Sequence, residues 1–223
     1  MKISLRAVGV SALILASAVA TTSYGQSAAE DPQAAALKLI RMSRTLHDRA
    51  IETSDPVLML SAARLRKDSG MKAGALGTLE NSGEDAGDIS GETFSWERWL
   101  EEAVRLSGGS DVIAGLATDI RTSGSKGLAG QAVYTEGRLA AHSSHRYSDL
   151  NFVGGEFAEV YSEGLGKADI DLFVRDSRGA IVCSQTDSSN INQCGWTPGA
   201  TGPFEVTLEN KSDFADTYAL TTN

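Results

Sequence analysis

The apolar residues of the first half of the chain recur at the spacing of amphipathic helices. Between residues 31 and 124 they return every three or four positions, which places them on one helical face. Asp31-Pro32 and Asp55-Pro56 each combine a helix-capping side chain with a proline suited to the first helical turn. Gly70 stands where a helix is expected to end. These features predict two helical hairpins, or about four helices. The apolar stripes are Leu39, Ile40, Leu46 and Ala50; Leu58, Met59, Ala62 and Leu65; Trp96, Trp99, Leu100, Ala103 and Val104; and Ile113, Leu116, Ala117 and Ile120.

The second half of the chain alternates apolar and polar residues instead. In "GPFEVTLEN", Phe204, Val206 and Leu208 point to one side of a strand and the polar residues between them to the other. The segments "RYSDLNFV" and "EFAEVYSEG" meet at Gly154-Gly155, which predicts a tight hairpin turn between them. Short strands, frequent turns and the lack of a later helical pattern predict an antiparallel β-sandwich of about eight strands.

The change of periodicity predicts a fold of the α+β class in which helices and strands occupy separate domains. A helical domain is expected at residues 26–122 and a β-sandwich domain at residues 132–223. The stretch at residues 123–131 is rich in Gly and Ser and is the expected linker. Within the helical domain, residues 71–92 are acidic and Gly-rich and lack apolar periodicity, which predicts a flexible connection.

The N-terminus has the composition of a secretory signal peptide. Lys2 and Arg6 precede an apolar run over residues 7–20, which is too short to span a bilayer and is followed by small residues. The expected signal comprises residues 1–25, and cleavage after Ala20 is the alternative. We therefore expect a periplasmic or secreted protein with no integral membrane segment after signal removal.

Removal of this signal makes an acidic chain more acidic. The formal net charge is −9, and loss of the basic residues Lys2 and Arg6 takes it to −11. Nucleic acids and anionic membrane surfaces repel such a chain at long range, so we expect no nucleic-acid partner. The expected partner is an unidentified protein or polysaccharide.

Cys183 and Cys194 are the only cysteines of the sequence. In an oxidising compartment we expect them to form one disulfide, which fixes an exposed loop and contributes about 3 kcal/mol of stability in the loop-entropy model. The competing hypothesis is a redox-active pair, but the CxxC spacing of such pairs is missing. Trp196 is expected to lie under this loop as an apolar plug.

The stretch "DIDLFVRDSRG" at residues 169–179 gathers three aspartates. Asp169 and Asp171 alternate with core-facing apolar residues, so we expect them to form the solvated face of a strand. Asp176 opens a sequence typical of a reverse turn, which closes at Gly179.

The alternative interpretation of these acids is a calcium site. Asp169 and Asp171 are two residues apart on one strand, so both carboxylates could reach the same ion. Calcium takes six to eight oxygen ligands, so further ligands would have to come from Asp187 and Asn190, or from Glu163. Apart from this possible calcium ion, we expect no cofactor.

The runs "ADIDLFVRDSRGAIVCSQ" and "WTPGATGPFEVTLENKSDFADTYALTTN" together resemble the bacterial pre-peptidase C-terminal domain. The resemblance covers residues 133–223 and implies a β-sandwich of jelly-roll type. It also implies a binding role, since some members look like calcium-assisted binders of collagen or polysaccharide. Two features depart from the family: no protease precedes the sandwich, and residues 123–135 lack the acids that calcium-binding members tend to carry there. The positions that match the pattern are Pro198, Gly202, Phe204, Asn210, Tyr218 and Leu220.

The sequence carries no recognisable catalytic motif. It has no GxSxG elbow, and no cysteine remains free once the disulfide forms. The histidines are His47, His142 and His145, and the "HSSH" stretch at residues 142–145 lacks a third zinc ligand. Trp96 and Trp99 have the spacing of a packed helix face, which is the interpretation we favour over a ligand site.

These observations predict a non-catalytic protein with an interaction or structural role. The first alternative is a calcium-assisted binding module that uses Asp169, Asp171, Asp187 and Asn190 to recognise extracellular polysaccharide or protein. The second alternative is a hydrolase with an unrecognised site around His142 and His145.

Overall fold

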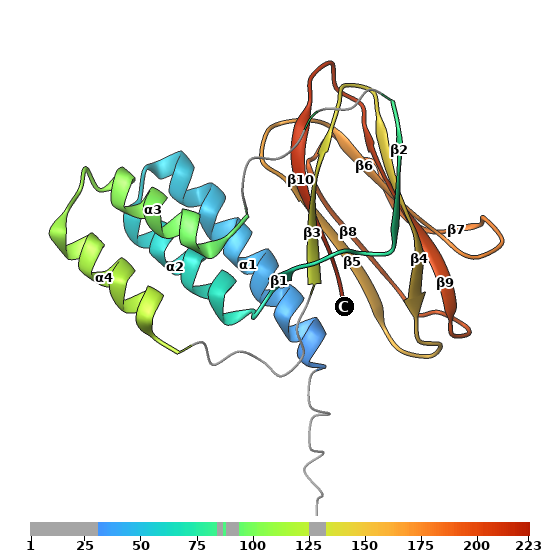
Figure 1. Cartoon of the computed structure of the whole chain (residues 1–223), viewed down its shortest axis with the longest axis horizontal. Coiled ribbons are helices and arrows are strands. Elements are labelled where there is room, and N and C mark those ends of the chain that lie inside the picture. The colour runs from blue at the N-terminus through green and yellow to red at the C-terminus, as the bar shows by residue number, and fades with distance from the viewer. Residues whose placement is uncertain (1–30, 84–86, 88–93, 125–132) are drawn as a thin grey trace, which may run out of the picture.

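The computed structural model describes residues 31–83, 87, 94–124 and 133–223. The predicted signal peptide at residues 1–25 lies outside the described residues, as does most of the linker predicted at residues 123–131. The described residues form the helices, on the left of Figure 1, and the sandwich, on its right.

The described residues of the N-terminal half form four helices, as the apolar stripes predict. They are α1 (Pro32–Thr53), α2 (Pro56–Asp68), α3 (Trp96–Leu106) and α4 (Asp111–Thr122). The Asp31 carboxylate accepts a hydrogen bond from the N–H of Gln33, and Asp55 accepts from Val57 and Leu58. Both carboxylates thus satisfy backbone groups that the first turn leaves unpaired.

The helices enclose a core of their own. Met59, Trp99, Leu100 and Ala103 are buried in it, which confirms that the tryptophan stripe of α3 is a packing face. The ammonium of Lys67 donates to three carbonyls in residues 120–123, so it closes the C-terminus of α4 against α2.

The C-terminal half is a β-sandwich of two five-stranded sheets, counted over the described residues. We call the sheet next to the helices the inner sheet and the other the outer sheet (Figure 1). In spatial order the inner sheet consists of β1 (Lys72–Ala73), β3 (Val133–Leu139), β10 (Asp216–Thr222), β5 (Ala158–Gly164) and β8 (Ile191–Trp196). The outer sheet consists of β2 (Thr78–Ser82), β4 (Ser144–Phe152), β9 (Gly202–Asn210), β6 (Ile170–Arg175) and β7 (Ile181–Gln185).

Alternating residues of these strands fill the space between the sheets, as the period of two predicts. Phe204, Val206 and Leu208 of β9 are buried there. They pack with residues 170, 172 and 174 of β6, and with Tyr218 and Leu220 of β10. Every strand pair is antiparallel except β1 with β3, so the predicted antiparallel sandwich is present.

The flexible connection predicted at residues 71–92 is wrong over its first part. Residues 72–73 form β1, which pairs with β3, and residues 78–82 form β2, which pairs with β4. Both short strands cover the edges of the sandwich with main-chain hydrogen bonds, which require no apolar periodicity. The sandwich therefore includes residues from within the helical half. Residues 84–86 and 88–93 of this connection lie outside the described residues.

The hairpin predicted at Gly154-Gly155 is also wrong in its placement. β4 belongs to the outer sheet and β5 to the inner sheet, so the turn carries the chain from one sheet to the other. Gly155 has a φ of +80°, and this left-handed conformation is why a glycine is required at the turn. Turn composition specifies a change of direction but not whether the next strand pairs with the previous one.

The helical half is packed directly on the inner sheet. Ala36, Leu37 and Ile40 of α1 are buried against Tyr161 of β5. As a result β5 is buried at every position, on the face toward the sandwich core and on the face toward α1. The molecule thus has three layers, helices, inner sheet and outer sheet, as Figure 1 shows.

The predicted disulfide between Cys183 and Cys194 is confirmed. Cys183 lies on β7, at one edge of the outer sheet, and Cys194 on β8, at one edge of the inner sheet. The bond therefore joins the two sheets of the sandwich at this edge. Trp196 packs edge-on against Phe152 with ring centroids 4.9 Å apart, so it belongs to the end of the sandwich core.

Candidate functional site

The aspartates of β6 are less solvated than predicted. Asp171 is 7% exposed, and its carboxylate lies 3.6 Å from the ammonium of Lys211. Burial raises the pKa of Asp171 above its ordinary value, and the charge of Lys211 only partly offsets this. The backbone of Asp169 is also engaged. Its carbonyl accepts from the N–H of Lys211, and the N–H of Asp169 donates to the hydroxyl of Ser212. The interpretation of these acids as a fully solvated face is therefore wrong for Asp171.

The structure does not bring the predicted calcium ligands together. Asp187 accepts from the side chain of Gln185 and the N–H of Ser189, so it orders its own loop. Asn190 donates to the carbonyls at positions 164 and 166. Among the described residues, no group of three or more His, Cys, Asp or Glu side chains is placed to hold a metal ion. The four candidates Asp169, Asp171, Asp187 and Asn190 do not form one site in this structure.

The two histidines of the "HSSH" stretch also lie apart. His142 is exposed, and its Nε2 lies 2.8 Å from a carboxylate oxygen of Asp213. His145 is buried, and its Nδ1 lies 2.7 Å from the hydroxyl of Tyr218, which in turn contacts the hydroxyl of Tyr147. One imidazole faces solvent and the other faces the sandwich core, so they do not form a joint site.

Charged side chains converge instead at the junction of the helices and the inner sheet. Arg66 of α2 and Glu163 of β5 form a bidentate ion pair, with 3.1 Å between Nη2 and Oε2, and both side chains are 1% exposed. The hydroxyl of Tyr161 donates to the same carboxylate at 3.1 Å. On its other side the Arg66 guanidinium stacks on the ring of Trp99, 4.2 Å from the centroid. Glu163, considered above as a calcium ligand, therefore has a different role.

Two arginines of α1 extend this contact along β5. Arg44 donates to the carbonyl of Gly164 at 2.6 Å and to the carboxylate of Asp48 at 2.7 Å. Arg41 forms an ion pair with Glu159, whose side chain is 5% exposed. Helix α1 is thus held on the inner sheet by charged contacts at both positions as well as by apolar packing.

These contacts shift the ionisation of the groups involved. Burial lowers the pKa of Arg44, but the carboxylates of Glu163 and Asp48 outweigh burial and keep the pKa above its ordinary value. Burial raises the pKa of Tyr161 well above its ordinary value, and the charge of Glu163 adds to this. Tyr161 and Arg44 therefore keep their protons at neutral pH and act as fixed donors.

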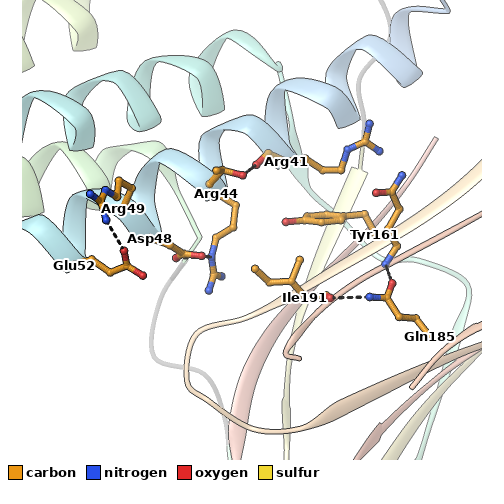
Figure 2. Close-up of a pocket in the computed structure, with 10 residues that line it drawn as sticks. Arg41, Arg44, Asp48, Arg49, Glu52, Tyr161, Gln185 and Ile191 are labelled. Carbon is orange, nitrogen blue, oxygen red and sulfur yellow. Dashed lines mark hydrogen bonds and ion pairs between the residues drawn. The ribbon is translucent and has the colours of Figure 1, made fainter. Parts of the chain in front are cut away.

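A groove of about 560 Å³ opens beside these contacts. One wall is a face of α1, and the floor is the inner sheet near its edge strand β8. Figure 2 shows the charged side chains of α1 opposite Tyr161, Gln185 and Ile191. The lining residues are Arg41, Arg44, Thr45, Asp48, Arg49, Glu52, Tyr161, Gln185, Ile191 and Gln193. This lining offers oriented hydrogen-bond donors and acceptors, so we take the groove as the candidate functional site.

Sequence reasoning missed this site because it depends on contacts between the two halves. One feature of the sequence does point to the buried contact beside the groove. Arg66 follows Met59, Ala62 and Ala63 at helical spacing, so it lies on the buried stripe of α2 and requires a buried carboxylate partner. Which acid fills that role depends on the packing of α1 and α2 on β5.

Comparisons with known proteins assign no family. No protein-family model and no curated protein matches the sequence. Solved structures that resemble part of it include the following three. The pre-peptidase C-terminal domain of a collagenase from Bacillus anthracis is 12% identical, with a TM-score of 0.34 over 41% of this chain and 89% of that chain. A periplasmic inhibitor of g-type lysozyme from Aeromonas hydrophila is 12% identical, with a TM-score of 0.31 over 41% and 86%. A C-terminal CBM6 of a laminarinase from Zobellia galactanivorans is 10% identical, with a TM-score of 0.26 over 38% and 76%. Similarity at this level assigns no function.

Proposed function

We propose that the protein is a non-catalytic binding module of the bacterial periplasm or exterior, and that its ligand occupies the groove between α1 and β8. The observation that carries this proposal is the groove itself, which both halves of the molecule build together. Its volume of about 560 Å³ lies within the range of small-ligand and peptide-segment sites. Seven of the ten lining residues have charged or amide side chains, so the ligand presents hydrogen-bonding groups to them.

The state of the lining residues supports binding. Arg44 is held by Asp48 and by a carbonyl of β5, and Arg41 is held by Glu159. Thr45 donates its hydroxyl to the carbonyl of Arg41. Side chains fixed in this way are ordered before a ligand arrives, which reduces the entropy lost on binding.

The disulfide supports the proposed location. A bond between Cys183 and Cys194 persists in oxidising compartments such as the periplasm or the exterior, and cytosolic reductants would oppose it. Among the described residues, no helix is long and apolar enough to cross a membrane. The disulfide agrees with the signal peptide expected from the sequence.

The residues that carry the resemblance to pre-peptidase C-terminal domains support the fold. Phe204, Tyr218 and Leu220 lie in the sandwich core, and the side chain of Asn210 donates to the carbonyls of Ala140 and Phe214. These residues stabilise a sandwich and leave the function to its surfaces. We also propose that this sandwich is of the jelly-roll type.

The proposal is tested by nuclear magnetic resonance titration of the isotope-labelled protein. One panel of ligands contains neutral and carboxylated oligosaccharides, and the other contains blocked peptides. At least one ligand should shift the backbone amides of Thr45, Asp48 and Gln193, and mass spectrometry should recover it chemically unchanged. Shifts confined to another surface, or cleavage of the bound ligand, would contradict the proposal.

A bulky substitution in the groove provides the matched control. Thr45→Trp fills the groove from the α1 wall and should abolish binding. Thr118→Trp is the control, because Thr118, like Thr45, is exposed in the middle of a helix. Each hydroxyl donates to the carbonyl four residues earlier, at 2.9 Å for Thr118 and 3.1 Å for Thr45. Equal loss of binding in both variants would mean that the groove is not the site.

A further inference from the structure

The floor of the groove ends at an unusual sheet edge. β8 is the last strand of the inner sheet and pairs with β5 on one side only. Gln193 lies opposite Tyr161 and Ile191 opposite Glu163 in this pairing, so their side chains share the face that looks toward α1. The groove therefore follows a strand edge, which is where the main chain of another segment can add to a sheet.

Side chains, and not another strand, cover the main-chain groups of this edge. The amide oxygen of Gln185 accepts from the N–H of Gln193 at 2.7 Å, and its NH₂ group lies 3.4 Å from the carbonyl of Ile191. The hydroxyl of Ser189 accepts from the N–H of Ile191 at 3.0 Å. A side-chain amide has the same donor and acceptor as a peptide unit, so Gln185 occupies the position that a neighbouring strand would take.

The α1 wall offers one cation that is easily released. Arg49 is 63% exposed and pairs with Glu52, itself 66% exposed, at 3.1 Å. An exposed ion pair of this kind adds little stability, so Arg49 can change partners with little loss. Each of the three guanidinium groups on this wall has an acidic partner, and the Arg49 pair is more exposed than the pairs of Arg41 and Arg44. Arg49 is therefore the cation of the wall that an acidic side chain on the ligand can engage.

We infer that the ligand is an extended peptide that displaces the Gln185 amide, pairs with β8 as an added strand, and places an acidic side chain against Arg49. This inference rests on the proposed function, since it specifies the ligand of the same groove. A carbohydrate fits the groove less well, because stacking on an exposed ring is a major contribution to sugar binding. Tyr161, the only aromatic residue of the described lining, is 2% exposed.

The test uses two pools of acetylated and amidated hexapeptides. Each peptide of the first pool has one Glu among Thr and Val residues, and the second pool has Lys in place of Glu. A neutral and a carboxylated oligosaccharide complete the set. The Glu pool should shift the groove amides at lower concentration than the Lys pool. It should also protect the N–H groups of Gln193 and Gly195 from hydrogen exchange. These residues are two positions apart on β8, so their N–H groups point to the same side of the strand.

Two variants give changes of opposite sign. Gln185→Ala removes the competing side chain and should tighten binding of the Glu pool by up to about tenfold, which corresponds to about 1.4 kcal/mol. Arg49→Ala should weaken binding of the Glu pool several-fold. Arg105→Ala is the matched control and should leave it unchanged. Arg105 is 69% exposed and pairs with Glu102 on the same helix, three residues away.

The outcomes separate the inference from the proposed function. If an oligosaccharide shifts the groove amides and neither peptide pool does, the inference is wrong and the proposed function stands. If Gln185→Ala weakens peptide binding or leaves it unchanged, the peptide does not pair with β8 and the inference is also wrong. If no member of either panel shifts the groove amides, both proposals fail.

Discussion

Replacing Glu163 by Gln tests how the two halves of the protein are held together. The substitution preserves the size of the side chain and removes its charge. Arg66 then remains 1% exposed with no carboxylate against it, and Arg44 loses an anion that lies 4.0 Å away. The amide can accept the hydrogen bond from Tyr161 but cannot balance a buried guanidinium.

The expected loss of stability is about 3–5 kcal/mol, the range for removal of one partner from a buried ion pair. The stacking of Arg66 on Trp99 is present in both the parent and the variant, so it does not compensate for the lost carboxylate. A loss of this size is a large part of the total stability expected for a domain, about 5–15 kcal/mol.

Urea unfolding followed by circular dichroism measures this loss. Glu205→Gln is the control, because Glu205 also pairs with arginines but is 27% exposed on the outer sheet, and it should cost about 1 kcal/mol or less. Equal and small losses in both variants would refute the reasoning, since they would mean that water reaches the Arg66–Glu163 pair.

Four further predictions concern separate parts of the molecule. Lys67→Met removes three hydrogen bonds to the end of α4, so hydrogen exchange in residues 117–123 should accelerate while exchange in β9 stays slow; unchanged exchange in α4 would be a contradiction. Serine at both Cys183 and Cys194 should lower the free energy of unfolding by about 3 kcal/mol in urea, and a loss below about 1 kcal/mol would show that the sheets do not need the bond. Burial raises the pKa of Asp171, so the folded state binds its proton more tightly and this group's contribution to stability falls as pH rises through its titration range. Asp171→Asn should therefore gain stability relative to the parent as pH rises from about 3 to about 7, and a difference independent of pH would contradict this. Calcium and a chelator should give the same melting temperature, because the candidate ligands stand apart, whereas a rise with calcium would reveal an ion bound to the folded form.

The individual elements of this fold can be predicted from the sequence because local physics specifies them. Asp31 and Asp55 cap helices whether or not anything packs against them, and the alternation of residues 204–208 is that of a strand with one buried face. The reverse turn after Asp176 is equally local, since its carboxylate accepts from the N–H groups of Arg178 and Ala180. Such features require no knowledge of distant residues.

The packing of the helices on the sandwich could not be predicted in the same way. Glu159, Tyr161 and Glu163 share one face of β5 and are polar, as on a solvent-facing side, yet all three are buried. These polar side chains can be buried because Glu159 and Glu163 pair with arginines of the helices, far away in sequence, and Tyr161 donates to Glu163. For the same reason the groove, which lies between α1 and β8, was not among the predicted sites.

The central claim is that the helical half and the sandwich form one body built around β5. Nuclear spin relaxation of the backbone amides tests this claim most directly. Because Arg66 and Glu163 join the halves in a buried contact, amides in α2 and in β9 should report the same rotational correlation time. Distinct correlation times for the helices and the strands would show two bodies that reorient independently, and the groove between them would then not exist as a formed site.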